Sequence, residues 1–242
     1  MIQISDLTKI FYRHRSLFQR ERIMVLKDIN LSVEKSSLVV IRGPNGAGKT
    51  TLLKVIAGLI LPDTGTVTVD GVSLERPQEL HAKVGLVTGN NRSFYARLSG
   101  LENLRFFGAT HNLYGKNLDA RIQKLADHLE ARPFLHVRYQ EYSQGMKARL
   151  GFMRALLHDP KILLLDEPFR SMDSGVMNHL KDWIDKELIR RQKKTVLMVS
   201  HREEEFQGWH GRLLCLDQGR IIGEKQIEGK SGVPQEEETV FQ

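Results

Sequence analysis

Nine residues from Gly43 to Thr51, GPNGAGKTT, have the composition and spacing of a loop that binds phosphate. The glycines at positions 43, 46 and 48 let the backbone adopt positive φ and turn successive N–H groups toward one anion. Lys49 would reach the β- and γ-phosphates of a nucleoside triphosphate, and the Thr50 hydroxyl would bind Mg²⁺. We therefore predict that the whole loop contacts a nucleotide: Gly43, Pro44, Asn45, Gly46, Ala47, Gly48, Lys49, Thr50 and Thr51.

A second group of polar residues follows two apolar runs in the last third of the chain. The run from 161 to 165 ends in Asp166 and Glu167, and the run from 195 to 200 ends in His201. Asp166 could hold Mg²⁺ together with Thr50, while Glu167 could polarise a water for attack on the γ-phosphate. The alternative is that one acid only caps the loop. His201 could hydrogen-bond the γ-phosphate or the attacking water, although a single histidine is more often an ordinary loop residue.

The segments around these residues indicate how they are positioned. Residues 38–41 are apolar and precede the phosphate loop, and 52–57 have the pattern of a helix, so a glycine turn that binds nothing is disfavoured. Strands alternating with helices predict an α/β fold with a mainly parallel sheet, which binds its ligands at the carboxyl ends of its strands. The run Thr195–Ser200 is expected to be a buried strand, and 176–188 a helix with one apolar face.

The middle of the chain changes to a helical period. Ser99 and Glu102 form a capping-box pattern ahead of a helix at 101–107, and Ser143 precedes a helix at 144–157. Between them, apolar residues recur on one face from 118 to 129. We predict a helical subdomain of about residues 90–158, inserted into the α/β core.

Composition limits the class of protein. The chain has 242 residues, a formal charge of +7 and a pI near 9.5, which would suit a polyanionic ligand, nucleic acid or the inner face of a membrane. Its one cysteine, Cys215, allows no internal disulfide, and no stretch approaches the roughly 20 apolar residues of a membrane span. We expect a cytoplasmic protein that reaches the membrane only through a partner.

Two surface segments leave alternatives open. The segment Arg13–Arg22 contains five basic residues and reads either as a solvated hairpin loop or as a basic patch that faces phospholipid or a membrane partner. Residues 225–242 are predicted to be a disordered tail. Its last five residues also resemble a protease recognition site left over from cloning, so the tail is either native or partly added for expression.

Together these motifs resemble the nucleotide-binding domain of the ATP-binding cassette (ABC) family, over about residues 2–224. Tyr142–Met146 stands at the position of the family's LSGGQ signature, Arg170–Asp173 at its D-loop, and Ser200-His201 at its switch histidine. Phe11 matches the aromatic residue that stacks on adenine, with Tyr12 as the alternative. The resemblance implies one ABC ATPase domain at 1–224, with a P-loop NTPase core and an N-terminal antiparallel β subdomain.

The resemblance also implies a function. Two copies would form a homodimer in which each ATP lies between the phosphate loop of one chain and Ser143, Gln144 and Gly145 of the other. Glu167, His201 and Lys49 would be catalytic, Thr50 and Asp166 would hold Mg²⁺, and closure around ATP would drive an integral membrane permease. The protein would then be the ATP-hydrolysing subunit of a transporter, peripheral on the inner face of the membrane. No nucleic acid is expected as a partner.

Departures from the family pattern set limits on this interpretation. Gly89 stands where the family has a glutamine that contacts Mg²⁺ and water, so either Asn90 takes that role or coupling to the permease is looser. In the signature, Tyr142, Gln144 and Met146 replace Leu, Gly and Gln. In these features the chain is similar to ATPase subunits of exporters for drugs, lipids or polysaccharides.

Two other functions stay open at this point. One is a soluble ABC ATPase of DNA repair or translation, which usually has coiled-coil insertions or two cassettes. The other is a regulatory module that binds ATP without turnover.

Overall fold

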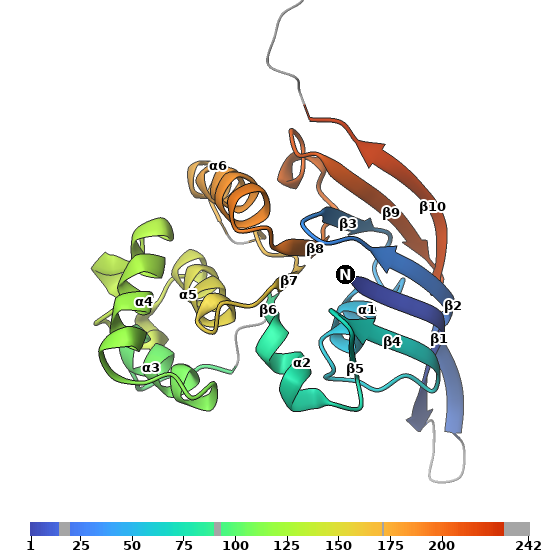
Figure 1. Ribbon diagram of the computed structural model, residues 1–242, viewed down its shortest axis with the longest axis horizontal. Coiled ribbons are helices and arrows are strands. Elements are labelled where there is room, and N and C mark those ends of the chain that lie inside the picture. Colours follow the sequence, from blue (N-terminus) through green and yellow to red (C-terminus); the bar gives the residue numbers. More distant parts are fainter. Residues whose placement is uncertain (15–19, 90–92, 171, 230–242) are drawn as a thin grey trace, which may run out of the picture.

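The computed structural model describes residues 1–14, 20–89, 93–170 and 172–229. Within these ranges, a six-stranded sheet lies between a four-stranded N-terminal sheet and a lobe of helices (Figure 1). The predicted α/β class, with an antiparallel N-terminal sheet and a mainly parallel core sheet, is confirmed. Asn90 and residues 230–242 of the predicted tail lie outside the described residues. The start of the predicted tail at residue 225 is wrong, because residues 225–227 are the end of the last strand and pair with its neighbour.

The N-terminal sheet is antiparallel, with the strand order β2-β1-β4-β5. Its strands are β1 (Ile2–His14), β2 (Arg20–Val33), β4 (Thr64–Val69) and β5 (Val72–Ser73). Of the two interpretations of Arg13–Arg22, the hairpin loop is wrong at both ends, because Arg13 pairs with Glu21 and Tyr12 with Arg22 in one long hairpin. Residues 15–19 of this segment lie outside the described residues. Backbone pairing continues there beyond the alternating apolar residues that marked the strands in the sequence.

The core sheet has the order β10-β9-β3-β8-β7-β6. All neighbouring pairs are parallel except β9 with β10, which is the closing hairpin expected near the end of the chain. The strands are β3 (Leu38–Arg42), β6 (Val84–Thr88), β7 (Ile162–Asp166), β8 (Thr195–Val199), β9 (Gly211–Asp217) and β10 (Arg220–Ile227).

Alternate side chains of each core strand enter two different apolar cores. Leu163 and Leu165 of β7 face the helical lobe, whereas Ile162 and Leu164 face the N-terminal sheet. Both sets are buried, as expected for a parallel sheet covered on both faces. The helix α1 (Lys49–Ile56) contacts β7 on one side and β2 and β4 on the other, so it fills the space between the sheets (Figure 1).

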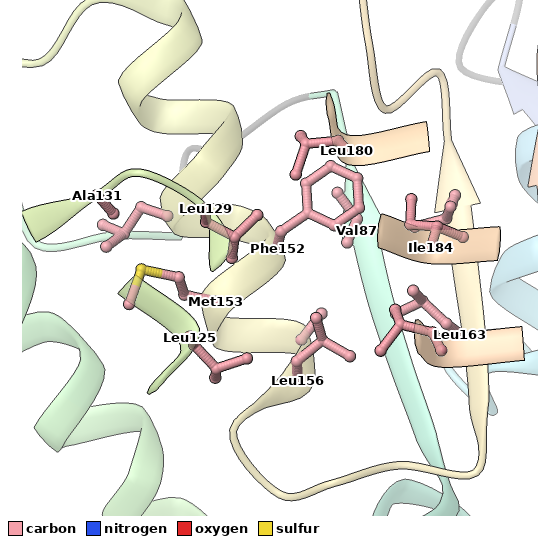
Figure 2. Close-up of a cluster of buried hydrophobic side chains, with 14 of the residues drawn as sticks. Val87, Leu125, Leu129, Ala131, Phe152, Met153, Leu156, Leu163, Leu180 and Ile184 are labelled. Carbon is pink, nitrogen blue, oxygen red and sulfur yellow. The ribbon is translucent and has the colours of Figure 1, made fainter. Parts of the chain in front are cut away.

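The helical lobe consists of α3 (Gly100–Thr110), α4 (Gly115–His128) and α5 (Gln144–Leu156), with 3₁₀ turns at Arg132–Phe134 and Tyr139–Glu141. The predicted capping box is present: Ser99 accepts a hydrogen bond from the Glu102 N–H at 3.2 Å, and Glu102 accepts one from the Ser99 N–H at 2.7 Å. Phe152 of α5 is fully buried in a cluster that joins the lobe to the sheet and to the helix α6 (Ser174–Trp183) (Figure 2).

Two helical features differ from the expectations. The predicted helix at 176–188 is an α-helix, α6 (Ser174–Trp183), which continues as a π-helix at Ile184–Arg191. A short helix, α2 (Pro77–Lys83), and a 3₁₀ turn at Glu203–Glu205 were not predicted. At seven and three residues, they are too short to produce a readable apolar period. No helix among the described residues is long and apolar enough to cross a bilayer.

Candidate nucleotide site

The phosphate loop connects β3 to α1 in a conformation that its glycines permit. Gly46 and Gly48 have φ of 82° and 103°. A Cβ on Gly43 would lie 1.9 Å from the Leu216 carbonyl oxygen, and one on Gly48 would lie 2.7 Å from that of Val25. The loop is therefore packed between β2 and β9 at positions where no larger residue fits. Gly48 is also the N-cap of α1 and has no side chain, so the first-turn N–H groups are left for a bound anion.

Lys49 lies across this loop and is only 6% exposed. Its Nζ donates hydrogen bonds to the carbonyl oxygens of Gly43 and Pro44, each at 2.8 Å. The two carbonyls therefore hold the ammonium group against the phosphate loop.

Thr50 and Asp166 come from opposite halves of the chain and meet at the carboxyl edge of the core sheet. The Thr50 hydroxyl lies 2.9 and 3.1 Å from the two carboxylate oxygens of Asp166. Burial raises the pKa of Asp166; the hydrogen bond from Thr50 acts in the opposite direction, and the charge of Glu167 raises the pKa further. A partly buried carboxylate next to a second acid is an environment that a cation would stabilise.

Glu167 and His201 follow the neighbouring strands β7 and β8. Glu167 has φ of 48°, and its N–H donates to the Val199 carbonyl at 3.0 Å, which ties the turn to the end of β8. Its Oε1 lies 3.4 Å from Nδ1 of His201, and its Oε2 lies 3.3 Å from a guanidinium nitrogen of Arg170. A non-glycine residue in the left-handed region is strained, and such strain persists where the surrounding structure enforces it.

A cavity of about 570 Å³ lies beside Thr50, Asp166 and Glu167, whereas Lys49 and His201 do not line it. Its lining residues are Thr50, Lys54, Thr88, Gly89, Asp166, Glu167 and Arg170. Arg170, which matches the D-loop in the sequence, also forms an ion pair with Glu167. This ion pair depends on the direction of a short turn, which the sequence does not reveal. Gly89 is at this cavity, as its alignment with the family's glutamine predicts. A Cβ there would be at ordinary contact distance, 3.7 Å from the Asp166 carbonyl oxygen, so no steric conflict requires glycine.

Phe11 lies on β1 opposite Ile23 of β2, two residues from Val25, whose carbonyl packs against the phosphate loop. It is 39% exposed, with Nζ of Lys9 at 5.4 Å from its ring centre. The neighbouring Tyr12 is 62% exposed. An accessible aromatic ring is thus available on β1, the strand that pairs with β2 next to the phosphate loop.

The signature residues lie on the helical lobe and do not line the cavity. Ser143 is the N-cap of α5 and accepts a hydrogen bond from the Met146 N–H at 3.2 Å, and Gln144 and Gly145 begin the helix. Tyr142, which replaces the family's leucine, is buried and donates its hydroxyl to the Phe134 carbonyl at 2.6 Å. The tyrosine therefore anchors the loop before α5 through a polar group that leucine lacks.

The loop, the paired acids at one sheet edge and the flanking helical lobe define a P-loop nucleotide-binding protein. A family model described as ABC transporter matches residues 26–170. The chain is 33% identical to the ABC transporter ATP-binding protein NatA of Bacillus subtilis, over 94% of this chain and 90% of that protein. It is 36% identical to the ergothioneine transport ATP-binding protein EgtV of Helicobacter pylori, over 81% and 88% of the two chains.

Among solved structures, a dimer of the ATP-binding cassette MJ0796 in a post-hydrolysis state, bound to ADP and Pi, is similar with a TM-score of 0.81. The two sequences are 26% identical, and the match covers 95% of this chain and all of the MJ0796 chain. This protein belongs to the ABC transporter family, as an ATP-binding and ATP-hydrolysing subunit.

The raised pKa of Asp166 has a consequence for stability. Because the native state disfavours the charged carboxylate, folding is penalised above the native pKa, and the penalty disappears as the pH falls toward the ordinary value of 3.8. We expect Asp166→Asn to raise the melting temperature of the nucleotide-free protein at pH 7, by roughly 2–4 °C for each 1 kcal/mol gained, and to lose this gain near pH 4. The exposed Asp182→Asn is the control. A lower melting temperature for Asp166→Asn at every pH would contradict this account.

Proposed function

We propose that the chain binds ATP across the phosphate loop and hydrolyses it with Glu167 as the general base. Lys49 holds the β- and γ-phosphates, and His201 orients the γ-phosphate or the attacking water. The observation that carries this proposal is the convergence of Thr50, Asp166, Glu167 and His201 at one sheet edge, through contacts of 2.9 to 3.4 Å.

Thr50 and Asp166 provide a donor set that fits Mg²⁺. Both supply oxygen ligands, and Mg²⁺ usually binds proteins through one or two such groups while it keeps water and phosphate oxygens. The partly buried Asp166, next to Glu167, gains from a nearby cation. A bound Mg²⁺ would supply positive charge to the phosphates.

We further propose that the active form is a homodimer in which Ser143, Gln144 and Gly145 of each chain face the nucleotide of the other. The N-terminus of α5, a helix of 13 residues, favours an anion, and the Ser143 hydroxyl is available there. In their own chain, these residues do not line the cavity beside Asp166. The dimeric form of the similar cassette MJ0796 supports this arrangement. Phe11 is proposed to stack on the adenine.

A surface for a membrane permease is proposed at the junction of the core and the helical lobe. Leu59 and Leu61, just after α1, are 57% and 62% exposed, and Tyr95 and Phe106 of the lobe are 49% and 44% exposed, with their rings 4.8 Å apart. A groove of about 750 Å³ runs between α2 and α5, with Leu59, His81, His111, Arg154 and His158 among its lining residues. An amphipathic segment of a permease would cover these apolar side chains and meet Arg154 in the groove.

The direction of transport remains a prediction. Export was predicted from the signature and from the segment after Gly89. Among the relatives, however, CysA of Rhodopseudomonas palustris and OsmV of Salmonella typhimurium are named as import proteins and are 33% and 31% identical. The comparisons therefore do not distinguish an exporter from an importer.

Replacing Glu167 tests the proposed chemistry. We expect Glu167→Gln to bind Mg·ATP normally, to lower turnover by about 10²- to 10⁴-fold because the general base is lost, and to accumulate as an ATP-bound dimer. Phosphate release and size-exclusion chromatography measure the two effects. Glu130→Gln is a matched control, since Glu130 also has positive φ, at 49°, and lies on the helical lobe. Turnover of Glu167→Gln at the wild-type rate would remove Glu167 from its role.

Replacing Phe106 tests the permease surface. We expect Phe106→Asp to keep the ATPase activity of the isolated subunit but to lose the integral membrane protein that co-purifies with the wild-type chain from its host's membranes. A charge buried in an apolar contact is costly. Ile222→Asp, at a position 66% exposed on β10, should retain the partner. Co-purification of the same membrane protein with Phe106→Asp would place the permease elsewhere.

A further inference from the structure

The loop that carries His201 is held by an ionic network around the buried carboxylate of Glu205, whose partner Arg202 is partly exposed. Ser200 is fully buried and Glu205 is 2% exposed. The Ser200 hydroxyl donates to one carboxylate oxygen of Glu205 at 2.6 Å. Arg202 donates to the other oxygen from Nε at 2.7 Å and from a second guanidinium nitrogen. Both oxygens of a buried carboxylate are thus used, and the two residues that flank His201 are fixed to it.

Arg202 also connects this loop to the loop that carries Glu167. Its guanidinium donates to the Phe169 carbonyl at 3.4 Å, two residues after Glu167. Phe169 is fully buried, so its carbonyl is a rigid point of attachment. On the other side, the Glu167 N–H bonds the end of β8. Besides the 3.4 Å contact between Glu167 and His201, the two loops are therefore joined by this backbone hydrogen bond and by the Arg202 side chain.

His201 depends on this support because little else holds it. Its side chain is 52% exposed, and the ion-pair contact to Glu167 at 3.4 Å is long for a hydrogen bond. The direction of the His201 side chain is set mainly by the backbone between Ser200 and Arg202. Both of these residues are hydrogen-bonded to the Glu205 carboxylate. A shift of about 1 Å in a reacting group can cost on the order of 10²-fold in rate.

We propose that Arg202 and Glu205 are positioning residues for hydrolysis: they form a strut that sets His201 against Glu167 and keeps the two loops in register. This rests on the proposed roles of His201 and Glu167. The strut does not touch the phosphate loop, so its loss lowers turnover and leaves nucleotide affinity unchanged.

The test must separate positioning from folding. A single substitution leaves a buried charge unpaired and destabilises the protein, whereas replacing both partners by apolar residues of similar size is often neutral or stabilising. The informative variant is therefore Arg202→Met with Glu205→Leu. We expect a melting temperature near that of the wild type, an Mg·ATP dissociation constant within about twofold, and kcat per nucleotide-binding site lower by roughly 10- to 100-fold.

The Arg105–Asp119 pair on the helical lobe provides a matched control. It is also a two-point contact between guanidinium and carboxylate, at 2.9 and 3.1 Å, but it is exposed and lies outside the site. Arg105→Met with Asp119→Leu should retain wild-type kcat. A wild-type kcat for the Arg202/Glu205 double variant would overturn the proposal and show that the pair serves folding alone.

A double-mutant cycle that combines the Arg202/Glu205 variant with His201→Ala determines whether the strut acts through the histidine. In single-turnover hydrolysis, the Arg202/Glu205 double variant should cause no more than a twofold further loss in the His201→Ala background, because the group that it positions is already absent. If the rate losses caused by the Arg202/Glu205 double variant and by His201→Ala multiplied when combined, the proposal would be overturned. If His201→Ala itself kept wild-type turnover, the proposed role of His201 would fail; if only the double variant did, the strut alone would fail.

Discussion

The parallel pairing of β3, β8 and β7 is the constraint on which the rest of the structure depends. Parallel strands in one register end at the same edge of a sheet, so the turns after Arg42, Asp166 and Val199 all open there. Residues more than a hundred positions apart thereby become neighbours, as the contact between Thr50 and Asp166 shows. The two apolar cores on either side of the sheet make this register rigid, because a slip of one residue would exchange the two faces of every strand.

The site is kept at a cost to local stability. Asp166 is a partly buried carboxylate with a raised pKa, Glu167 beside it adopts positive φ, and two further glycine positions tolerate no side chain. A structure optimised only for stability would relieve each of these features. The raised pKa of Asp166 is explained if a polyphosphate and a cation bind at this edge and offset the charge.

Much of this arrangement could be predicted from the sequence, and the reason differs between elements. The phosphate loop, Asp166 and His201 lie at the carboxyl ends of core strands, as predicted, because glycine spacing and apolar runs report local backbone geometry and strand ends. The extent of the β1–β2 hairpin was missed because Arg13 and Arg22 are held there by backbone pairing, which leaves no apolar pattern. The contacts of Arg170 and Arg202 with carboxylates could not be predicted, since they depend on the direction of turns only a few residues long.

One departure from the family pattern, Gly89, lies at the cavity beside Asp166, and another, Tyr142, lies on the helical lobe. Gly89 contributes no side chain where the family has glutamine, and Arg170 places a guanidinium against Glu167 in the same space. On the lobe, the buried hydroxyl of Tyr142 fixes the loop before Ser143. These differences leave the groups proposed for phosphate binding and water activation in place.

The most direct measurement is a structure of the chain with Mg·ATP, using Glu167→Gln to prevent turnover. The account predicts a triphosphate seated on the N–H groups of Gly43–Thr51, a magnesium ion in contact with Thr50 and Asp166, and Ser143 of a second copy facing the γ-phosphate. A triphosphate bound away from the loop, or a metal ion that contacts neither Thr50 nor Asp166, would contradict it.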